Sequence, residues 1–233
     1  MRTVRLGPLI GLFAQVLQLA VLAAIVGLGV AGWVTGVGYA LFLCAALTHG
    51  LDREAEGAFG PADWVTLTRA TFVGNVTALV ADTFHRPAPV AVLVVIAIVA
   101  MILDAVDGQV ARHTGTVSEL GARFDMEVDA FLILVLSVYV ARSMGAWVLA
   151  IGVMRYAYVA ASWALGWMHG PLPRRYWRKV VAATQGIVLV CASAGVLPAP
   201  LVLVALAAAL ALLVESFARD TVWLWRHRAV VHR

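Results

Sequence analysis

The sequence predicts an all-α integral membrane protein of about eight transmembrane helices, six of which form one core. Of its 233 residues, 63% are hydrophobic and only 13% are charged. Soluble domains carry about 25% charged residues, because much of their surface faces water. This composition excludes a soluble domain and a disordered chain. The only two cysteines, Cys44 and Cys191, lie inside apolar runs, which excludes a disulfide-rich scaffold.

Eight apolar stretches are long enough to cross the roughly 30 Å hydrocarbon layer of a bilayer. They lie near residues 8–30, 34–50, 64–83, 88–111, 122–142, 145–168, 178–196 and 199–217. The first follows Arg2 and Arg5, as the apolar part of a secretory signal would. Its length and the second span directly behind it favour a membrane helix instead. We expect a tight turn at residues 32–36 between the first two spans.

A polar segment divides the chain into parts. Residues 51–63 separate the first two spans from the other six. We therefore expect an N-terminal transmembrane hairpin over residues 1–58, a core over residues 59–220 and a basic tail over residues 221–233. The aromatic and basic residues near the C-terminus are typical of an amphipathic helix that lies on the membrane.

Arginine and lysine are distributed unevenly between the two ends of the expected spans. Arg86 and Arg142 lie at one set of ends, and most of the others lie at the opposite set. Cytoplasmic loops carry an excess of these residues, so we expect a multi-pass protein of the cell membrane with both termini in the cytoplasm. The net charge of +4 suits anionic lipid headgroups, and no nucleic-acid partner is expected.

Four aspartates stand at the cytoplasmic ends of two successive expected helices: Asp104, Asp107, Asp125 and Asp129. At about 100° per residue, the members of each pair share a helix face. A turn within residues 113–120 would bring the two pairs together. Converging carboxylates repel one another unless cations neutralise them, and all-oxygen ligands suit Mg²⁺, Mn²⁺ or Ca²⁺. A solvated polar loop is the alternative, which the helical spacing and the flanking apolar runs disfavour.

Small residues accompany the aspartates at helical spacing: Gly108, Ala111 and Gly121. They leave the helix surface without bulk, so that a flat ring or a phosphate could approach the backbone. Close packing of helices is the alternative explanation for each of them. Arg112 adds a bidentate donor for phosphate beside the aspartates.

The complete stretch reads D-x2-D-G-x2-A-R-x8-G-x3-D-x3-D, and in it the chain resembles the CDP-alcohol phosphotransferase family. The members of this family are membrane enzymes of phospholipid synthesis. The resemblance covers about residues 60–220, with six spans that match the six-helix core of the family. The segment from Pro61 to Arg69 is similar to the opening P-N-x-x-T-x-x-R of the family, but it has Ala62 and Asp63 where asparagine is usual.

The resemblance implies transfer of a substituted phosphate, such as phosphatidyl, from a CDP-diacylglycerol-type lipid to an alcohol, with release of CMP. It implies two divalent ions, Mg²⁺ or Mn²⁺, held by Asp104, Asp107 and Asp125. Asp129 would act as the general base and share in metal coordination. The residues implied for the CDP site are Asp107, Gly108, Ala111, Arg112 and Gly121.

Three basic residues further along are candidates for binding a small polar, phosphorylated acceptor. Arg155 lies inside a span and should face the bundle interior, where it could instead pair with an acid such as Glu215. Arg178 and Lys179, the only lysine of the chain, are similar to basic residues of family members that use phosphorylated acceptors. A positive anchor at the cytoplasmic surface is the alternative for both.

Two other functions stay open. A divalent-cation transporter or channel also carries acids in its membrane part, but distributed over the depth of the bilayer. Here the acids gather at one face, with Asp82 near the other. A non-catalytic lipid-binding relative is the second alternative, which the complete motif disfavours. A homodimer is compatible with the sequence.

Overall fold

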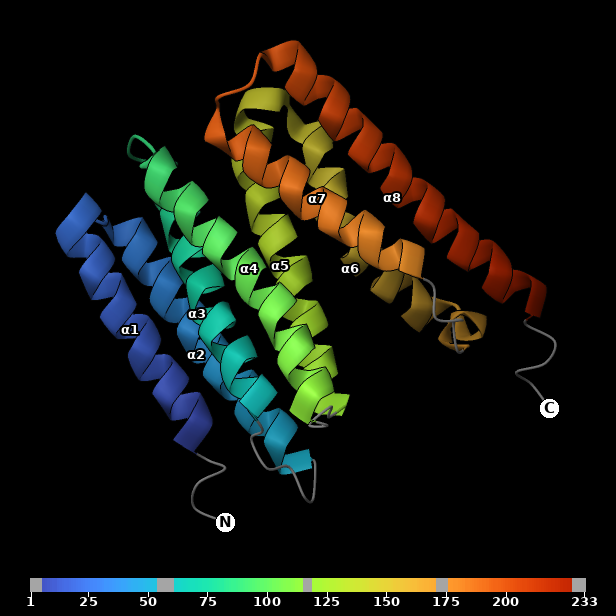
Figure 1. Cartoon of the computed structure of the whole chain (residues 1–233), viewed down its shortest axis with the longest axis horizontal. Helices are drawn as coiled ribbons and strands as arrows, with labels where there is room; N and C mark the ends of the chain where they lie inside the picture. The colour runs from blue at the N-terminus through green and yellow to red at the C-terminus, as the bar shows by residue number, and fades with distance from the viewer. Residues whose placement is uncertain (1–5, 54–60, 115–118, 171–175, 228–233) are drawn as a thin grey trace. The chain divides into compact units, whose positions relative to one another are not determined.

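The computed structural model describes residues 6–53, 61–114, 119–170 and 176–227. Within these ranges it has eight α-helices, two short 3-10 helices and no strand, which confirms the all-α fold (Figure 1). The helices are α1 Leu6–Val26, α2 Val30–Arg53, α3 Pro61–Asp82, α4 Val90–Thr114, α5 Glu119–Met144, η1 Ala146–Val148, α6 Leu149–Ala164, η2 Gly166–His169, α7 Tyr176–Ala194 and α8 Ala199–His227.

The chain divides into two compact units, Met1–Val135 and Leu136–Arg233, and α5 runs across the boundary. In the first unit, α1, α2 and α3 pack on one another and α4 packs along α3 (Figure 1). In the second unit, α7 packs along α8, and α6 also contacts α8. Because α8 continues to His227, the first seven residues of the expected basic tail are helical.

Helix α3 is the most buried helix of the first unit, and it is also unusually polar. Most of its residues from Thr66 to Asp82 are buried. Its Asn75 accepts a hydrogen bond from Gln15 of α1 at 2.8 Å and donates one to Gln18 of α1 at 2.6 Å. Burying an amide without partners would be costly, and these contacts remove most of that cost.

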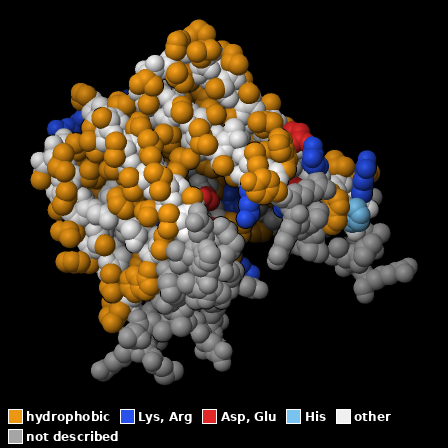
Figure 2. Space-filling model, viewed as in Figure 1, with side chains coloured by type: hydrophobic (Ala, Val, Ile, Leu, Met, Phe, Trp, Pro, Cys, Tyr) orange, Lys and Arg blue, Asp and Glu red, His pale blue; other side chains and the backbone are white. Residues whose placement is uncertain are grey.

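The surface of the protein is suited to lipid. Hydrophobic side chains cover most of the described face in Figure 2, and charged ones are few. Phe13 on α1 and Phe42 on α2 are each 72% exposed, which is unfavourable in water and ordinary in a bilayer. By length and composition, four helical stretches can cross a membrane: Leu6–Val26, Val30–Leu51, Ala146–Ala164 and Ala199–His227. The chain is a multi-pass membrane protein.

The prediction of a turn at residues 32–36 is wrong, because these residues lie inside α2. The connection between α1 and α2 is at Gly27 to Gly29, and Gly27 has a φ of +69° that residues with side chains rarely adopt. Apolar residues flank this turn on both sides, so no polar break in the sequence marks its position. Gly36 has a packing role instead, since a Cβ there would lie 2.7 Å from the Leu19 side chain of α1.

Candidate metal and transfer site

The aspartates of the motif converge from two helices in the first unit. Asp104 lies on α4, and Asp125 and Asp129 lie on α5. One carboxylate oxygen from each of these three residues lies within 4.8 Å of the others. Asp107 is also on α4, but its side chain is outside the described part of the structure. The spacing along the chain thus corresponds to a real cluster of carboxylates.

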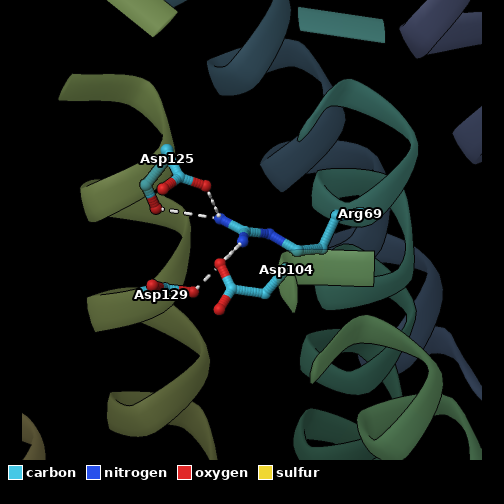
Figure 3. A network of polar contacts seen from close by, with 4 residues as sticks. All are labelled: Arg69, Asp104, Asp125 and Asp129. Carbon is cyan, nitrogen blue, oxygen red and sulfur yellow. Dashed lines mark hydrogen bonds and ion pairs between the residues drawn. The ribbon is translucent and has the colours of Figure 1, made fainter. Parts of the chain in front are cut away.

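The guanidinium group of Arg69 lies among these carboxylates (Figure 3). Its Nη1 pairs with Asp104 and lies 3.4 Å from Asp129 Oδ1. Its Nη2 lies 2.7 Å from Asp125 Oδ1 and donates a hydrogen bond of 2.9 Å to the main-chain oxygen of Asp125. The Arg69 side chain is only 1% exposed, so it spans the interior from α3 to the cluster.

Helix α3 brings Arg69 to this place from the side opposite Asp125 and Asp129 (Figure 3). The helix begins at Pro61, and Asp63 in its first turn favours the helix by its charge. Arg69 then follows two turns later on a buried face, between the buried residues Leu67 and Ala70. A charged side chain so deeply buried needs partners of opposite charge, and the aspartates provide them.

Arg69 was not among the site residues expected from the sequence. The signal was present, because Arg69 is the last residue of the segment that is similar to the family's opening motif. The segment alone predicts no partner for Arg69, because Asp104 and Asp125 follow it by 35 and 56 residues along the chain. Only the packing of α3 against the other helices brings these residues together.

The charge and chemistry of the cluster fit a divalent cation. Asp104, Asp125 and Asp129 carry three negative charges and Arg69 carries one positive charge, which leaves a formal charge of minus two. The ligand atoms offered are all carboxylate oxygens, which Mg²⁺ and Mn²⁺ prefer. The three aspartate side chains are 34–43% exposed, so an ion can reach them.

Of the small residues expected around the CDP group, the structure describes the surroundings of Gly121. It lies on α5 four residues before Asp125, so both are on one face of the helix, and it is partly exposed. Gly108, Ala111 and Arg112 belong to α4, but their side-chain surroundings lie outside the described residues. The same holds for the expected turn, of which residues 115–118 are not described.

The candidate acceptor residues all belong to the second unit. Arg155 lies on α6 and is partly buried, while Arg178 and Lys179 lie in the first turn of α7. Arg178 Nε is 3.6 Å from Asp220 Oδ2 of α8, and the Asp220 side chain is only 8% exposed. Lys179 is exposed. Arg178 therefore connects α7 to α8, in addition to any role toward an acceptor.

Glu215, the acid suggested as an alternative partner for Arg155, has two other partners in the second unit. Its Oε2 accepts a hydrogen bond from Trp177 Nε1 at 3.0 Å. Its Oε1 pairs with Arg219, one helical turn further along α8. Both carboxylate oxygens of Glu215 are thus engaged at the junction of α7 and α8.

The sequence model of the family described as CDP-alcohol phosphatidyltransferase matches residues 60–217, which is more than half of the chain. No curated protein and no solved structure matches the chain significantly. The matched range begins just before α3 and includes the whole aspartate cluster and Arg69, whereas α1 and α2 precede it.

Proposed function

The chain belongs to the CDP-alcohol phosphatidyltransferase family, and from that premise we propose that it transfers a phosphatidyl group from CDP-diacylglycerol to an alcohol and releases CMP. The family makes the protein a membrane-bound transferase of phospholipid synthesis. The observation that carries the finer proposal is the convergence of Asp104, Asp125 and Asp129 within 4.8 Å. The intact motif supports an active enzyme over a lipid-binding relative.

The proposed ligands of two ions, Mg²⁺ or Mn²⁺, are Asp104, Asp107, Asp125 and Asp129. Bound there, the ions would neutralise the charge that develops on the CMP leaving group. Arg69 lowers the charge of the cluster by one and holds the carboxylates of α4 and α5 at short range. Arg69 therefore orients the aspartates and is not itself a metal ligand.

The proposed general base is Asp129, which would accept the proton of the acceptor hydroxyl. An alcohol is a weak nucleophile, so a carboxylate within hydrogen-bond reach increases its reactivity. The Asp129 side chain is 43% exposed and its Oδ1 lies 3.4 Å from Arg69 Nη1, whereas Asp125 Oδ1 lies 2.7 Å from Arg69 Nη2. Arg69 therefore holds Asp129 less closely than Asp125, which suits a group that must exchange a proton.

The remaining assignments concern the substrates. For the CDP group we propose Asp107, Gly108, Ala111, Arg112 and Gly121. For the acceptor we propose Arg155, Arg178 and Lys179. The residues over 59–220 would form the catalytic core, with the aspartate end on the cytoplasmic side of the cell membrane. The uneven distribution of arginine supports this orientation.

The decisive experiment measures CMP release from CDP-diacylglycerol by the purified protein across a panel of alcohols. The panel should contain glycerol 3-phosphate, inositol phosphate, serine and a phospholipid acceptor. We expect CMP release with one of them in Mg²⁺ or Mn²⁺ and none in excess chelator. Full release in chelator would remove the metal assignment, and absence of release with every acceptor would remove the proposed reaction.

A further inference from the structure

The N-terminal hairpin of α1 and α2 lies outside the range that matches the family, yet it contacts the helix that carries Arg69. Both α1 and α2 pack directly on α3. In Figure 1 these three helices run side by side. The hairpin is thus placed to influence the position of α3, and one side chain does so next to the site.

That side chain is Tyr39 of α2. Its hydroxyl group donates a hydrogen bond of 3.1 Å to the main-chain oxygen of Ala70 on α3. Its ring stacks on the ring of Phe131 of α5, with the centroids 5.3 Å apart and the planes inclined by 18°. Tyr39 therefore contacts α3 and α5 at the same time.

The two contact points adjoin the ion pairs of the site. Ala70 is the residue after Arg69, and Phe131 is two residues after Asp129. Arg69 and Asp129 are themselves in contact, at 3.4 Å between Nη1 and Oδ1. A shift of the Tyr39 ring would move α3 relative to α5 at the place where this contact is made.

The position of the ring is sterically defined by Gly74, one turn after Ala70 on α3. A Cβ at Gly74 would lie 2.7 Å from Cδ1 of Tyr39 and 2.5 Å from Oε1 of Gln15. Contacts below 3.0 Å force a shift, and an aromatic ring cannot bend away as a flexible chain end can. Glycine at this position lets Tyr39 approach the backbone of α3 closely.

We propose that Tyr39 is a positioning residue for the aspartate–arginine site, and that the N-terminal hairpin acts as a brace for the catalytic core through it. This inference rests on the proposed function of the site. Its physical basis is that outer-layer contacts orient metal ligands, and their loss commonly lowers metal affinity or activity by about 10–100-fold. A small misplacement of reacting groups also has a large effect on rate.

The test compares Tyr39→Leu and Tyr39→Phe with Phe42→Leu as the matched control. Phe42 is also an aromatic residue of α2, but its side chain is 72% exposed. The measurements are the dissociation constant of the folded protein for Mn²⁺, the kcat and KM for CMP release, and the unfolding temperature in chelator. Only the first three report on positioning, since any packing defect lowers the unfolding temperature.

We expect Tyr39→Leu to weaken Mn²⁺ binding about tenfold and to lower kcat, with a smaller change in the KM for the donor. Tyr39→Phe keeps the stacked ring and loses only the hydrogen bond, so its effect should be about threefold. Gly74→Ala, which displaces the same ring, should resemble Tyr39→Leu. Phe42→Leu should match the wild type.

The inference is overturned when the folded Tyr39 variants bind Mn²⁺ and turn over like the wild type, whatever their unfolding temperature. If Tyr39→Leu does not fold, the result for Tyr39→Phe tests the inference, because this variant preserves the stacked ring. Failure of the proposed function looks different, since the wild type itself would then neither bind Mn²⁺ nor release CMP.

Discussion

Arg69 holds Asp125 by two contacts of a single nitrogen. Its Nη2 donates to the main-chain oxygen of Asp125 at 2.9 Å and lies 2.7 Å from the carboxylate of the same residue. The guanidinium therefore fixes both the backbone of α5 and the direction of the Asp125 side chain. The other nitrogen pairs with Asp104 of α4, so one side chain from α3 connects both helices of the motif.

Replacing Arg69 should make the fold depend more strongly on metal. Arg69→Met removes the positive charge between three carboxylates, so their mutual repulsion increases. A fully buried pair costs about 3–5 kcal/mol to break, and exposure of the aspartates lowers this figure through solvent screening. We expect a lower unfolding temperature in chelator and a larger rise on adding Mg²⁺ than in the wild type.

Arg69→Lys provides the control for charge alone. Lysine keeps the positive charge but lacks the planar fork that reaches two carboxylates at once. Its unfolding temperature in chelator should lie between those of the wild type and Arg69→Met. Identical behaviour of all three proteins would show that Arg69 does not neutralise the cluster.

Asp129→Asn should separate catalysis from binding. The amide cannot accept the proton of the acceptor hydroxyl, so turnover should fall below detection while CDP-lipid binding stays near the wild-type value. Asp104→Asn should weaken binding of Mn²⁺ and the nucleotide more strongly than Asp129→Asn does, because Asp104 is proposed as a ligand alone, whereas Asp129 only shares in coordination. Binding is measured by calorimetry and turnover by CMP release. Turnover of Asp129→Asn at the wild-type rate would remove the assignment of the base.

Local sequence patterns predict part of the site and leave another part unassigned. The cluster of Asp104, Asp125 and Asp129 could be predicted, because helical spacing within one hairpin decides which side chains face each other. Arg69 could not be assigned, because its contacts depend on how α3 packs against α4 and on its side chain reaching α5, which no local pattern records. The eight helices were predictable from apolar runs along the sequence, although only four described stretches are long and apolar enough to cross a membrane.

The turn between α1 and α2 was misplaced for a related reason. Turn prediction relies on polar and glycine-rich breaks, but Gly27 and Gly29 stand among apolar residues, while Gly32 and Gly36 are interior to α2. What ends α1 is the positive φ of Gly27, and what starts α2 is the contact of Gly29 with Asp82, 53 residues away. Neither cause is visible in a short window of sequence.

That contact predicts a variant that affects stability alone. Asp82 Oδ2 accepts a hydrogen bond of 3.0 Å from the backbone N–H of Gly29, which would otherwise be an unsatisfied donor at the start of α2. Asp82→Ala should reduce the free energy of unfolding by about 1 kcal/mol, as loss of a helix cap does. Mn²⁺ affinity should not change. A large loss of Mn²⁺ affinity would mean that the two ends of α3 are coupled.

The orientation of the chain can be tested by labelling single cysteines. After Cys44 and Cys191 are replaced by alanine, cysteines introduced at Thr116 and Arg174 should react with an impermeant reagent only from the cytoplasmic face. His85, which is exposed just after α3, provides the opposite control. Its cysteine variant should react only from outside. Reversed labelling at all three positions would invert the topology, and labelling of Thr116 from outside would exclude a cytoplasmic site.

The last prediction concerns the acceptor, which we expect to carry a negative charge such as a phosphate. Arg155 lies within a helix that can cross the membrane, where ionisable side chains commonly mark a binding site. Lys179 is exposed at the start of α7, whereas its neighbour Arg178 is engaged with Asp220. A phosphorylated acceptor would accept charge-assisted hydrogen bonds from Arg155 and Lys179.

Arg155→Ala and Lys179→Ala should therefore raise the KM for the acceptor at least about tenfold, which corresponds to one lost charge-assisted contact, and leave the KM for the CDP donor nearly unchanged. Arg178→Ala should differ from both, because it also breaks the pair with Asp220 and should lower the unfolding temperature. The measurement is steady-state CMP release with one substrate varied at a time. Equal increases in both KM values would favour a structural or donor-binding role for Arg155 and Lys179, since an acceptor site alone has no reason to weaken the donor.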